Sequence, residues 1–228
     1  MNKKYSREDI ENVIKKKDAW WTVLVIDHIA IPLTLFVANY LPFLSPNIFT
    51  LSSLITSLLA AFYFFKERFL LGAVLYEIAF LFDCIDGKLA KLTKRQSISG
   101  LWLDKISDKT RLYFNTIGLS IKCCPLIGIT FVFMYLWDEI DAITYENLSL
   151  KHKKDKYETI NTNSKITNFL LKHRLALLPS AVEMDTLAFF IGPIVSLKWG
   201  FILAITLAIL RKIVIHSHFK LGNAFKEE

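Results

Sequence analysis

Six apolar runs alternate with polar segments along most of this chain of 228 residues. The runs cover residues 47–65, 69–87, 98–121, 124–137, 184–197 and 199–215. Apolar stretches with few charges predict helices that cross a hydrocarbon core of about 30 Å. Several runs are short for that distance, which suits helices that protrude or enclose a polar cavity. The pattern therefore predicts an all-α integral membrane protein with six transmembrane helices.

A further apolar stretch, residues 18–43, precedes the first run and differs from it. Asp27 and His28 interrupt this stretch, and Trp20 and Trp21 stand near its start. Because tryptophan favours the headgroup zone of a bilayer, we expect an amphipathic helix that lies in the membrane interface. A transmembrane span is the alternative interpretation, and it would invert the orientation deduced from the charges.

Composition and charge support a membrane protein and orient it. Hydrophobic residues make up 53% of the chain, and the formal net charge is +7. If the N-terminus is cytoplasmic, 21 Lys and Arg residues fall in the cytoplasmic segments 1–46, 88–97, 138–183 and 211–228, and four fall in the outer turns. This asymmetry predicts a multi-pass protein in which both termini and residues 83–108 face the cytoplasm.

Four aspartates recur at fixed spacing where the second run ends and the third begins. They are the acidic positions of the pattern Asp83-x2-Asp86-Gly87-x2-Ala90-Lys91-x8-Gly100-x3-Asp104-x3-Asp108. A carboxylate in mid-membrane costs about 2.5–3.5 kcal/mol on insertion scales, so intramembrane aspartates are candidates for a functional site. Four of them repel one another unless cations lie between them. The spacing therefore indicates a metal site.

Helical geometry brings these carboxylates together in pairs. Residues three or four apart share a helix face, so Asp83 points with Asp86, and Asp104 with Asp108. The short connection between the two helices lets them return antiparallel, with the two pairs facing each other. Oxygen ligands of this kind suit Mg²⁺ or Mn²⁺. We expect two ions, because a pair can stabilise both the attacking and the leaving oxygen of a phosphoryl displacement.

Small and basic residues around the aspartates fit a ligand that carries phosphate. Gly87 and Ala90 lie one turn beyond the first aspartate pair, where larger side chains would block a nucleotide. Gly100 precedes Asp104 by one turn and lets the helices approach closely. Lys91 can place a cation against a diphosphate. Ordinary helix packing for the glycines, and anchoring of the cytoplasmic side for Lys91, are the alternative interpretations.

Residues 83–108 resemble the signature of the CDP-alcohol phosphatidyltransferase family, D-x2-D-G-x2-A-R-x8-G-x3-D-x3-D. The one departure is Lys91, which stands at the family's arginine position and supplies a point charge in place of a bidentate contact. The stretch from Ser45 to Thr50 is similar to the family's Pro-Asn-x-x-Thr opening of the first span. We therefore expect Asn47 and Thr50 among the substrate-binding residues, with Gly87, Ala90, Lys91 and Gly100.

The resemblance implies a six-helix fold, a homodimer and a polar cavity that faces the cytoplasm. It implies that Asp83, Asp86 and Asp104 bind metal, and that Asp108 completes the metal site and acts as general base on the acceptor hydroxyl. The implied partners are a CDP-linked donor (CDP-diacylglycerol or a soluble CDP-alcohol), an alcohol or alcohol-phosphate acceptor, and membrane lipids, but no nucleic acid. The reaction would give a phosphodiester and CMP.

Two other classes of protein are open alternatives on the sequence alone. Intramembrane prenyltransferases also hold diphosphate with aspartates and Mg²⁺, but they use two distant clusters, and the aspartates here lie within residues 83–108. A cation transporter would also use acidic residues, but transporters commonly show two corresponding halves with broken helices. Release of CMP would distinguish a phosphotransferase from a transporter.

These interpretations divide the chain into three parts. Residues 1–45 form an N-terminal cytoplasmic and interfacial segment, residues 46–215 a six-helix phosphotransferase domain, and residues 216–228 a cytoplasmic tail. The segment Asp18-Ala19-Trp20-Trp21 and the later stretch RLALLPSAVEMD, which ends at Asp185, look similar to the branch of the family that includes inositol-phosphate-transferring enzymes.

Overall fold

The computed structural model of the chain describes residues 4–122, 124–152 and 165–224, and no β-strand occurs among them. The helices are α1 (Arg7–Glu11), α2 (Asp27–Tyr40), α3 (Pro46–Phe65), α4 (Phe69–Leu92), α5 (Ile98–Ser120), α6 (Pro125–His152), α7 (Lys165–Lys172), α8 (Ala181–Asp185), α9 (Gly192–Val195) and α10 (Leu197–Ala224). Two π-helical turns, Thr22–Ile26 and Thr186–Ile191, lead into α2 and join α8 to α9. The predicted all-α class is confirmed.

Local sequence signals fix the ends of the helices that carry the aspartates. Ser97 caps α5, because its hydroxyl accepts a hydrogen bond of 3.0 Å from the backbone N–H of Gly100. At the end of α4, the N–H of Arg95 donates to the carbonyl of Ala90 at 2.9 Å, and the N–H of Lys94 donates to that of Lys91 at 3.2 Å. This pair of bonds is the Schellman pattern of helix termination. The connection between α4 and α5 is therefore short and well defined.

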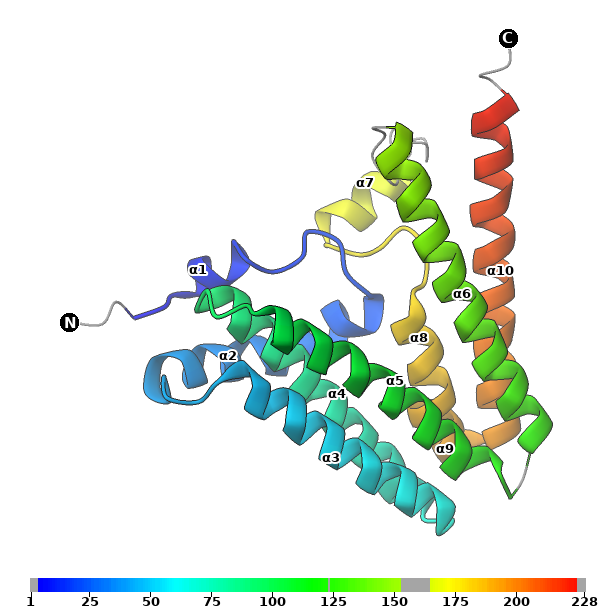
Figure 1. Ribbon diagram of the computed structural model, residues 1–228, viewed down its shortest axis with the longest axis horizontal. Helices are drawn as coiled ribbons and strands as arrows, with labels where there is room; N and C mark the ends of the chain where they lie inside the picture. Colours follow the sequence, from blue (N-terminus) through cyan, green and yellow to red (C-terminus); the bar gives the residue numbers. More distant parts are fainter. Residues whose placement is uncertain (1–3, 123, 153–164, 225–228) are drawn as a thin grey trace.

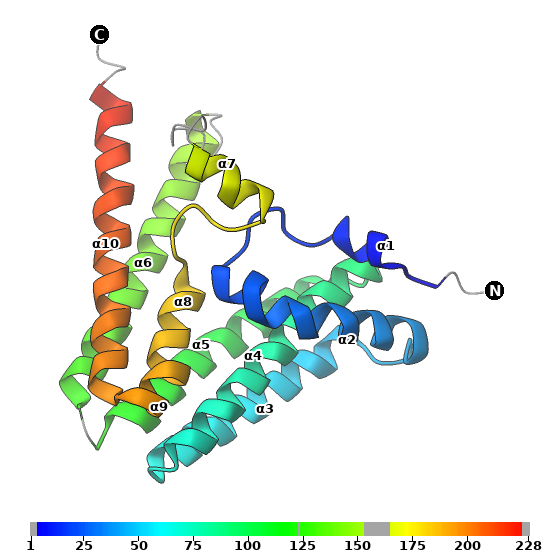
Figure 2. The same cartoon turned by 180° about the vertical axis from the view of Figure 1, so that it is seen from behind.

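The helices form two groups that meet at one end of the molecule (Figures 1 and 2). In one group α3 packs along both α4 and α5, and in the other α6 packs against α10. Gly118 of α5 allows the close approach to α3, because a Cβ at that position would come within 2.4 Å of the carbonyl oxygen of Ala61. Residues 174–180 and the stretch of chain that follows α1 lie between the two groups, at the end where the groups spread apart (Figure 2).

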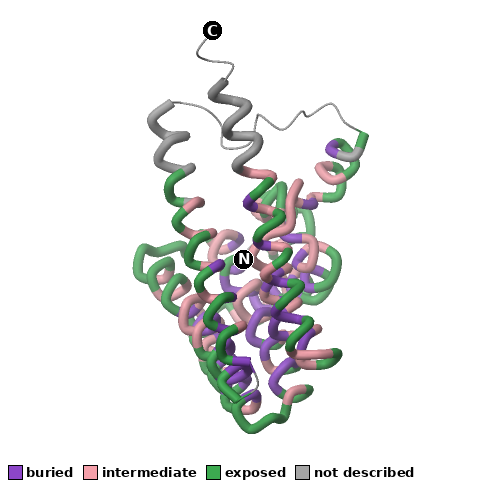
Figure 3. Tube along the Cα trace, turned by 90° about the vertical axis from the view of Figure 1, so that its right-hand side faces the viewer, coloured by how far each residue is buried: buried purple, intermediate pink, exposed green. Residues whose placement is uncertain are grey.

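The main hydrophobic core fills the junction of the two groups. Phe189 lies at its centre. The centroid of the Phe189 ring is 4.9 Å from that of Tyr76 on α4 and 5.7 Å from that of Phe131 on α6. Figure 3 shows buried positions on the inner faces of these helices and exposed positions along the outside. Large apolar side chains cover the outer face of α3, where Ile55 and Phe62 are each 52% exposed. Such apolar outer faces are typical of helices that contact lipid.

Helices lie at all six predicted positions, but the predicted six spans are supported only in part. By length and composition, two helices among the described residues are able to cross a membrane: Thr22–Tyr40 and Pro46–Phe65. The other spans stay a prediction. The first of the two helices falls in the stretch that we expected to lie in the interface, so its length and apolar character also fit the alternative of a transmembrane span.

This helix runs along the carboxyl-terminal half of α4 and in the same direction (Figure 2). Near its start Ala30 packs in one buried cluster with Ile85, and near its end Val37 packs in another with Leu89. Asp27, the first residue of α2, is 4% exposed and forms an ion pair of 2.9 Å with Lys88 of α4. The segment before α3 is thus part of the folded core around α4.

Candidate active site

A cavity of about 550 Å³ lies between α4, α5, the start of α3 and the segments around Lys15 and Asp185. All ten residues that the sequence predicted for the site line this cavity: Asn47, Thr50, Asp83, Asp86, Gly87, Ala90, Lys91, Gly100, Asp104 and Asp108. They come from three helices: α3, α4 and α5. The structure therefore places the predicted residues around one space of the size that ligand pockets usually have.

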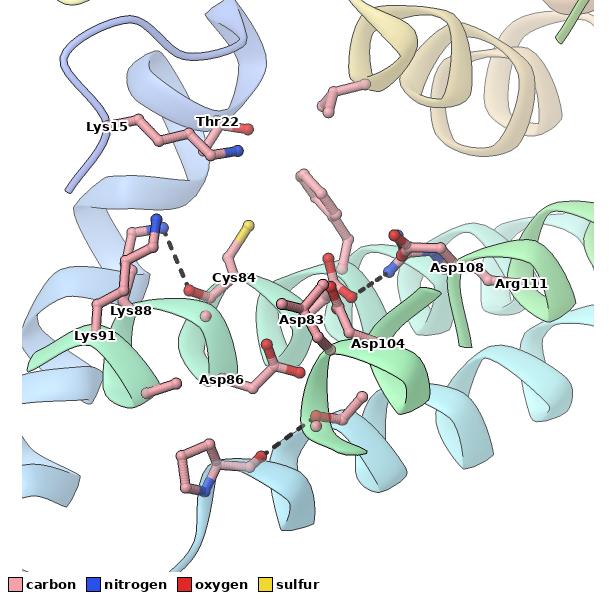
Figure 4. A pocket seen from close by; sticks show the side chains of 18 of the residues that line it. Lys15, Thr22, Asp83, Cys84, Asp86, Lys88, Lys91, Asp104, Asp108 and Arg111 are labelled. Carbon is pink, nitrogen blue, oxygen red and sulfur yellow. Dashed lines mark hydrogen bonds and ion pairs between the residues drawn. The ribbon is translucent and has the colours of Figure 1, made fainter. Parts of the chain in front are cut away.

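Three of the aspartates form a compact cluster of oxygen atoms. Asp83 from α4 and Asp104 and Asp108 from α5 each place one carboxylate oxygen within 4.8 Å of the other two (Figure 4). The antiparallel return of α5 produces this arrangement, since it brings the last turns of α4 against the first turns of α5. A set of carboxylate oxygens at this separation fits a hard divalent cation.

The fourth aspartate, Asp86, lies outside this trio. It is 6% exposed, and its Oδ2 has no hydrogen-bond partner among the described residues. Thr50 of α3 lines the same cavity, and its hydroxyl donates to the carbonyl of Pro46 at 3.5 Å. Because a buried carboxylate oxygen without a partner is costly, the group fits a site that a cation or a substrate donor completes. The donor set as a whole is therefore suitable for a divalent metal.

Arg111 is a prominent residue of the site that the sequence analysis did not identify. Its Nη2 lies 2.6 Å from Oδ1 of Asp108, and its Nη1 lies 3.2 Å from Oδ1 of Asp83. The side chain is 8% exposed, and its guanidinium lies 5.7 Å from the centroid of the Phe80 ring. Arg111 follows Asp108 by three residues, so the helical spacing was the signal that could have found it. It offsets part of the charge of the aspartate cluster.

Cations gather at the other end of the cavity (Figure 4). Lys15 lies 3.8 Å from Asp18, and Lys88 is paired with Asp27. No ion pair of Lys91 occurs among the described residues, and partial burial, together with Lys15 nearby, lowers the pKa of its ammonium group. An anionic ligand in the cavity would oppose this lowering of the pKa, because a nearby negative charge favours the protonated ammonium group. The cavity is therefore acidic at one end and basic at the other.

The glycines of the pattern have different surroundings. A Cβ at Gly87 would meet no atom within 4 Å, so this position borders open space in the cavity. A Cβ at Gly100 would lie 3.0 Å from Oδ1 of Asn47 and 3.0 Å from Oγ of Ser97. Gly100 thus permits the close packing of α5 on the start of α3 and keeps the Asn47 amide beside the aspartate-bearing helices.

The two stretches that look similar to one branch of the family lie side by side in the structure. The backbone N–H of Asp18 donates to the carbonyl of Arg174 at 2.9 Å, and the N–H of Ala176 donates to the carbonyl of Asp18 at 2.9 Å. The indole N–H of Trp20 also donates to the carbonyl of Ala176 at 2.7 Å. These bonds join the N-terminal segment to the chain before α8. Asp18 and, from α8, Ala181, Val182 and Asp185 contribute to the wall of the cavity.

Comparison with known proteins agrees with this arrangement of residues. The family model described as CDP-alcohol phosphatidyltransferase matches residues 43–214, which include the four aspartates and the cavity walls from α3, α4, α5 and α8. The chain therefore belongs to the CDP-alcohol phosphatidyltransferase family, whose members transfer substituted phosphate groups.

Curated relatives are similar over a smaller part of the chain. A CDP-diacylglycerol–serine O-phosphatidyltransferase of Helicobacter pylori is 32% identical over 66 residues, and the corresponding protein of a second strain has the same identity over the same length. The similar region covers 29% of this chain and 28% of each relative. The match therefore spans less than a third of these relatives.

Proposed function

We propose that this protein is a divalent-metal-dependent CDP-alcohol phosphotransferase, which moves a phospho-alcohol group from a CDP-linked donor to an acceptor hydroxyl and releases CMP. The observation that carries the proposal is the trio Asp83, Asp104 and Asp108, whose oxygens lie within 4.8 Å of one another in a cavity with lysines at its other end. Membership of the family supports the same reaction class. The prenyltransferase and transporter alternatives have no comparable support.

The proposed donor is CDP-diacylglycerol, and the proposed acceptor is a small polar alcohol with serine as the first candidate. The Helicobacter pylori relatives are named for both compounds, as CDP-diacylglycerol–serine O-phosphatidyltransferases. The apolar outer faces of the helices are also suited to a donor that carries acyl chains. The product would be a membrane phospholipid, which places the reaction in phospholipid biosynthesis.

The four aspartates would hold the cation, with Mg²⁺ or Mn²⁺ as the expected metal and two ions as the expected number. When bound, such ions neutralise the charge of the diphosphate and of the departing CMP. Lys91 contacts the diphosphate at the basic end of the cavity. Gly87 and Ala90 leave room for the nucleotide, while Asn47, Thr50 and Gly100 shape the opposite wall.

Asp108 is proposed as the general base. The acceptor hydroxyl oxygen attacks the phosphorus that bears the alcohol, and the bond from this phosphorus to the CMP oxygen breaks. The hydroxyl proton passes to the Asp108 carboxylate, which lines the cavity beside Asp83 and Asp104. Arg111 bonds to one Asp108 oxygen, Oδ1, and so orients the carboxylate.

The proposal includes a location and a domain organisation. The distribution of Lys and Arg supports a multi-pass membrane protein with the cavity facing the cytoplasm. The division into residues 1–45, 46–215 and 216–228, and a homodimer, are retained as parts of the proposal. The folded contacts of α2 with α4 indicate that the first segment also contributes to the catalytic unit.

Replacement of Asp108 by asparagine should lower turnover more than it weakens donor binding. Proton removal occurs only during the reaction, and general-base catalysis typically contributes about 10²- to 10⁴-fold. We expect CMP release to fall within that range while thermal stabilisation by the donor persists. If Asp108→Asn abolished donor stabilisation as fully as Asp83→Asn does, Asp108 would serve only as a metal ligand and would not be the base.

Replacement of Lys91 by alanine should raise the donor KM or lower turnover by about ten- to a hundred-fold, because a desolvated, charge-assisted phosphate contact contributes about 1.5–3 kcal/mol. Lys91→Arg should retain activity, since arginine keeps the charge. The matched control is Lys16→Ala, which removes an exposed lysine of the cytoplasmic segment 1–46 that does not line the cavity. Equal small effects of Lys91→Ala and Lys16→Ala on CMP release would show that Lys91 only anchors the cytoplasmic side.

A further inference from the structure

A second cavity, of about 680 Å³, lies beside the end of α4 and outside the candidate active site. Its walls come from residues 4–13, from residues 37–44 at the end of α2, and from residues 89–95. Lys91 and Arg95 line both cavities. The two spaces are therefore neighbours that share the last turn of α4.

The wall formed by the N-terminal segment is held in place by specific contacts. The Asn39 side chain accepts a hydrogen bond of 2.7 Å from the N–H of Tyr5 and donates one of 2.9 Å to the carbonyl of Tyr5. Ile10 is fully buried in a cluster with Val37 and Leu89. Because backbone bonds and a buried apolar anchor both fix this segment, the cavity is a built feature of the fold.

Cations dominate the polar lining of this second cavity. Lys4, Lys91, Lys94 and Arg95 line it, and Asp9 is the acidic residue among the described residues of the lining. The Asp9 carboxylate is already engaged, because it accepts hydrogen bonds of 2.7 Å and 2.8 Å from the backbone and hydroxyl of Ser6. Arg95 donates to the carbonyl of Pro42 at 2.7 Å, which holds its guanidinium at the cavity. The space therefore favours an anion.

Lys94 has a positive φ, which indicates a functional role for its side chain. Its φ is +55°, in the left-handed region that glycine adopts without strain. The position follows the end of α4, where glycine is the usual residue. A lysine here is strained, and strained residues cluster at functional sites. The side chain of Lys94 lines the second cavity and is absent from the lining of the first.

The apolar part of the cavity lies at the boundary of the proposed membrane region. Leu41 and Leu44 line it, in the turn that joins the two helices able to cross a membrane. Tyr40 and Phe43, at the same turn, are 61% and 75% exposed. Exposed aromatic residues at helix ends mark the level of the lipid headgroups. Nζ of Lys4 lies 5.4 Å from the centroid of the Tyr40 ring, so a cation also lies at the level of the headgroups.

We propose that the second cavity binds the phosphate headgroup of an anionic phospholipid of the surrounding bilayer. Lys4, Lys94 and Arg95 contact the phosphate, and the first carbons of the acyl chains lie against Leu41 and Leu44. A free phosphate would use the cations but not the apolar wall. Because Lys91 and Arg95 line both cavities, the bound headgroup steadies the end of α4 beside the active site. The second cavity shares Lys91 and Arg95 with the candidate active site but contains none of the four aspartates, and Lys4 and Lys94 line it alone.

The test measures lipid bound to the purified full chain in detergent by native mass spectrometry, with EDTA present so that metal-dependent ligands of the active site do not contribute. Wild-type protein should retain phosphatidylglycerol in preference to phosphatidylcholine. The double variant Lys4→Ala/Lys94→Gly should bind phosphatidylglycerol about 25-fold more weakly, because each of the two basic residues near a membrane surface contributes about a fivefold attraction to anionic lipid. Lys198→Ala, an exposed lysine away from the cavity, should bind like wild type.

The single variant Lys94→Gly separates binding from folding. Its thermal midpoint should equal or exceed that of wild type, because glycine removes the backbone strain, while its binding of phosphatidylglycerol should still fall. Equal binding of phosphatidylglycerol by wild type, by Lys94→Gly and by Lys4→Ala/Lys94→Gly would overturn the proposal. Displacement of the lipid by inorganic phosphate at equal concentration would also overturn it, since the cavity would then be a free-phosphate site.

Discussion

Asparagine in place of Asp83 or Asp104 should reduce CMP release by about a hundredfold or more, because loss of a metal ligand removes several kcal/mol of charge stabilisation. The substitution keeps the shape of the side chain but removes the negative charge that the cation requires. Both residues place an oxygen within the 4.8 Å cluster, so each should be individually necessary. The measurement is CMP formation by purified protein at millimolar Mg²⁺, with expression and membrane insertion checked alongside.

The matched control is an aspartate outside the cavity. Asp141 on α6 forms an ion pair of 2.7 Å with Lys212 of α10 and does not line the candidate active site. Asp141→Asn should therefore leave CMP formation near the wild-type level. Substantial activity of both Asp83→Asn and Asp104→Asn would exclude the proposed metal site.

Glutamine in place of Arg111 should lower the thermal midpoint by about 10 °C in the presence of EDTA. Breaking a buried ion pair typically costs about 3–5 kcal/mol, and about 2–4 °C is lost per kcal/mol in a protein of this size. The guanidinium is 8% exposed and contacts both Asp83 and Asp108, so its removal leaves two carboxylates without their cation. Mg²⁺ should restore part of the lost stability, because it supplies the missing charge.

Arg111→Lys serves as the comparison for this prediction. Lysine keeps the charge but cannot contact two carboxylates with one planar group, so its effect in EDTA should be intermediate. Thermal midpoints of wild type and both variants, each with and without Mg²⁺, provide the test. If Mg²⁺ gave wild type and Arg111→Gln the same increase, the carboxylates of Asp83 and Asp108 would not be the cation ligands.

The sequence was sufficient to predict much of the site, because its determinants are local. Proline at the start of α3 and Ser97 at the start of α5 are strong helix signals, and both helices begin there. The spacing of Asp104 and Asp108 places them on one helix face, and the short connection from α4 returns that face toward Asp83. Asp86 lines the same cavity from α4 but lies outside the compact trio, so its role as a metal ligand stays a prediction.

The remaining features depend on contacts between distant segments. Hydrogen bonds join Asp18 to Arg174 and Ala176, and no pattern within either segment specifies the other. The ion pair of Asp27 with Lys88 likewise depends on the packing of α2 along α4, which neither segment specifies alone. The apolar runs also underestimated the lengths of α6 and α10, because these helices continue past their apolar residues. Asp138 of α6, directly after the run 124–137, forms an ion pair with Arg211 of α10.

The most direct test of the proposed function is CMP release by the purified wild-type protein from a panel of CDP-linked donors and acceptor alcohols. Each donor and acceptor pair is assayed with Mg²⁺ and with EDTA. The account predicts Mg²⁺-dependent CMP formation, strongest with CDP-diacylglycerol and a small polar alcohol such as serine, and loss of the signal in EDTA. Folded protein that forms no CMP from any donor and acceptor pair in the presence of Mg²⁺ would contradict it.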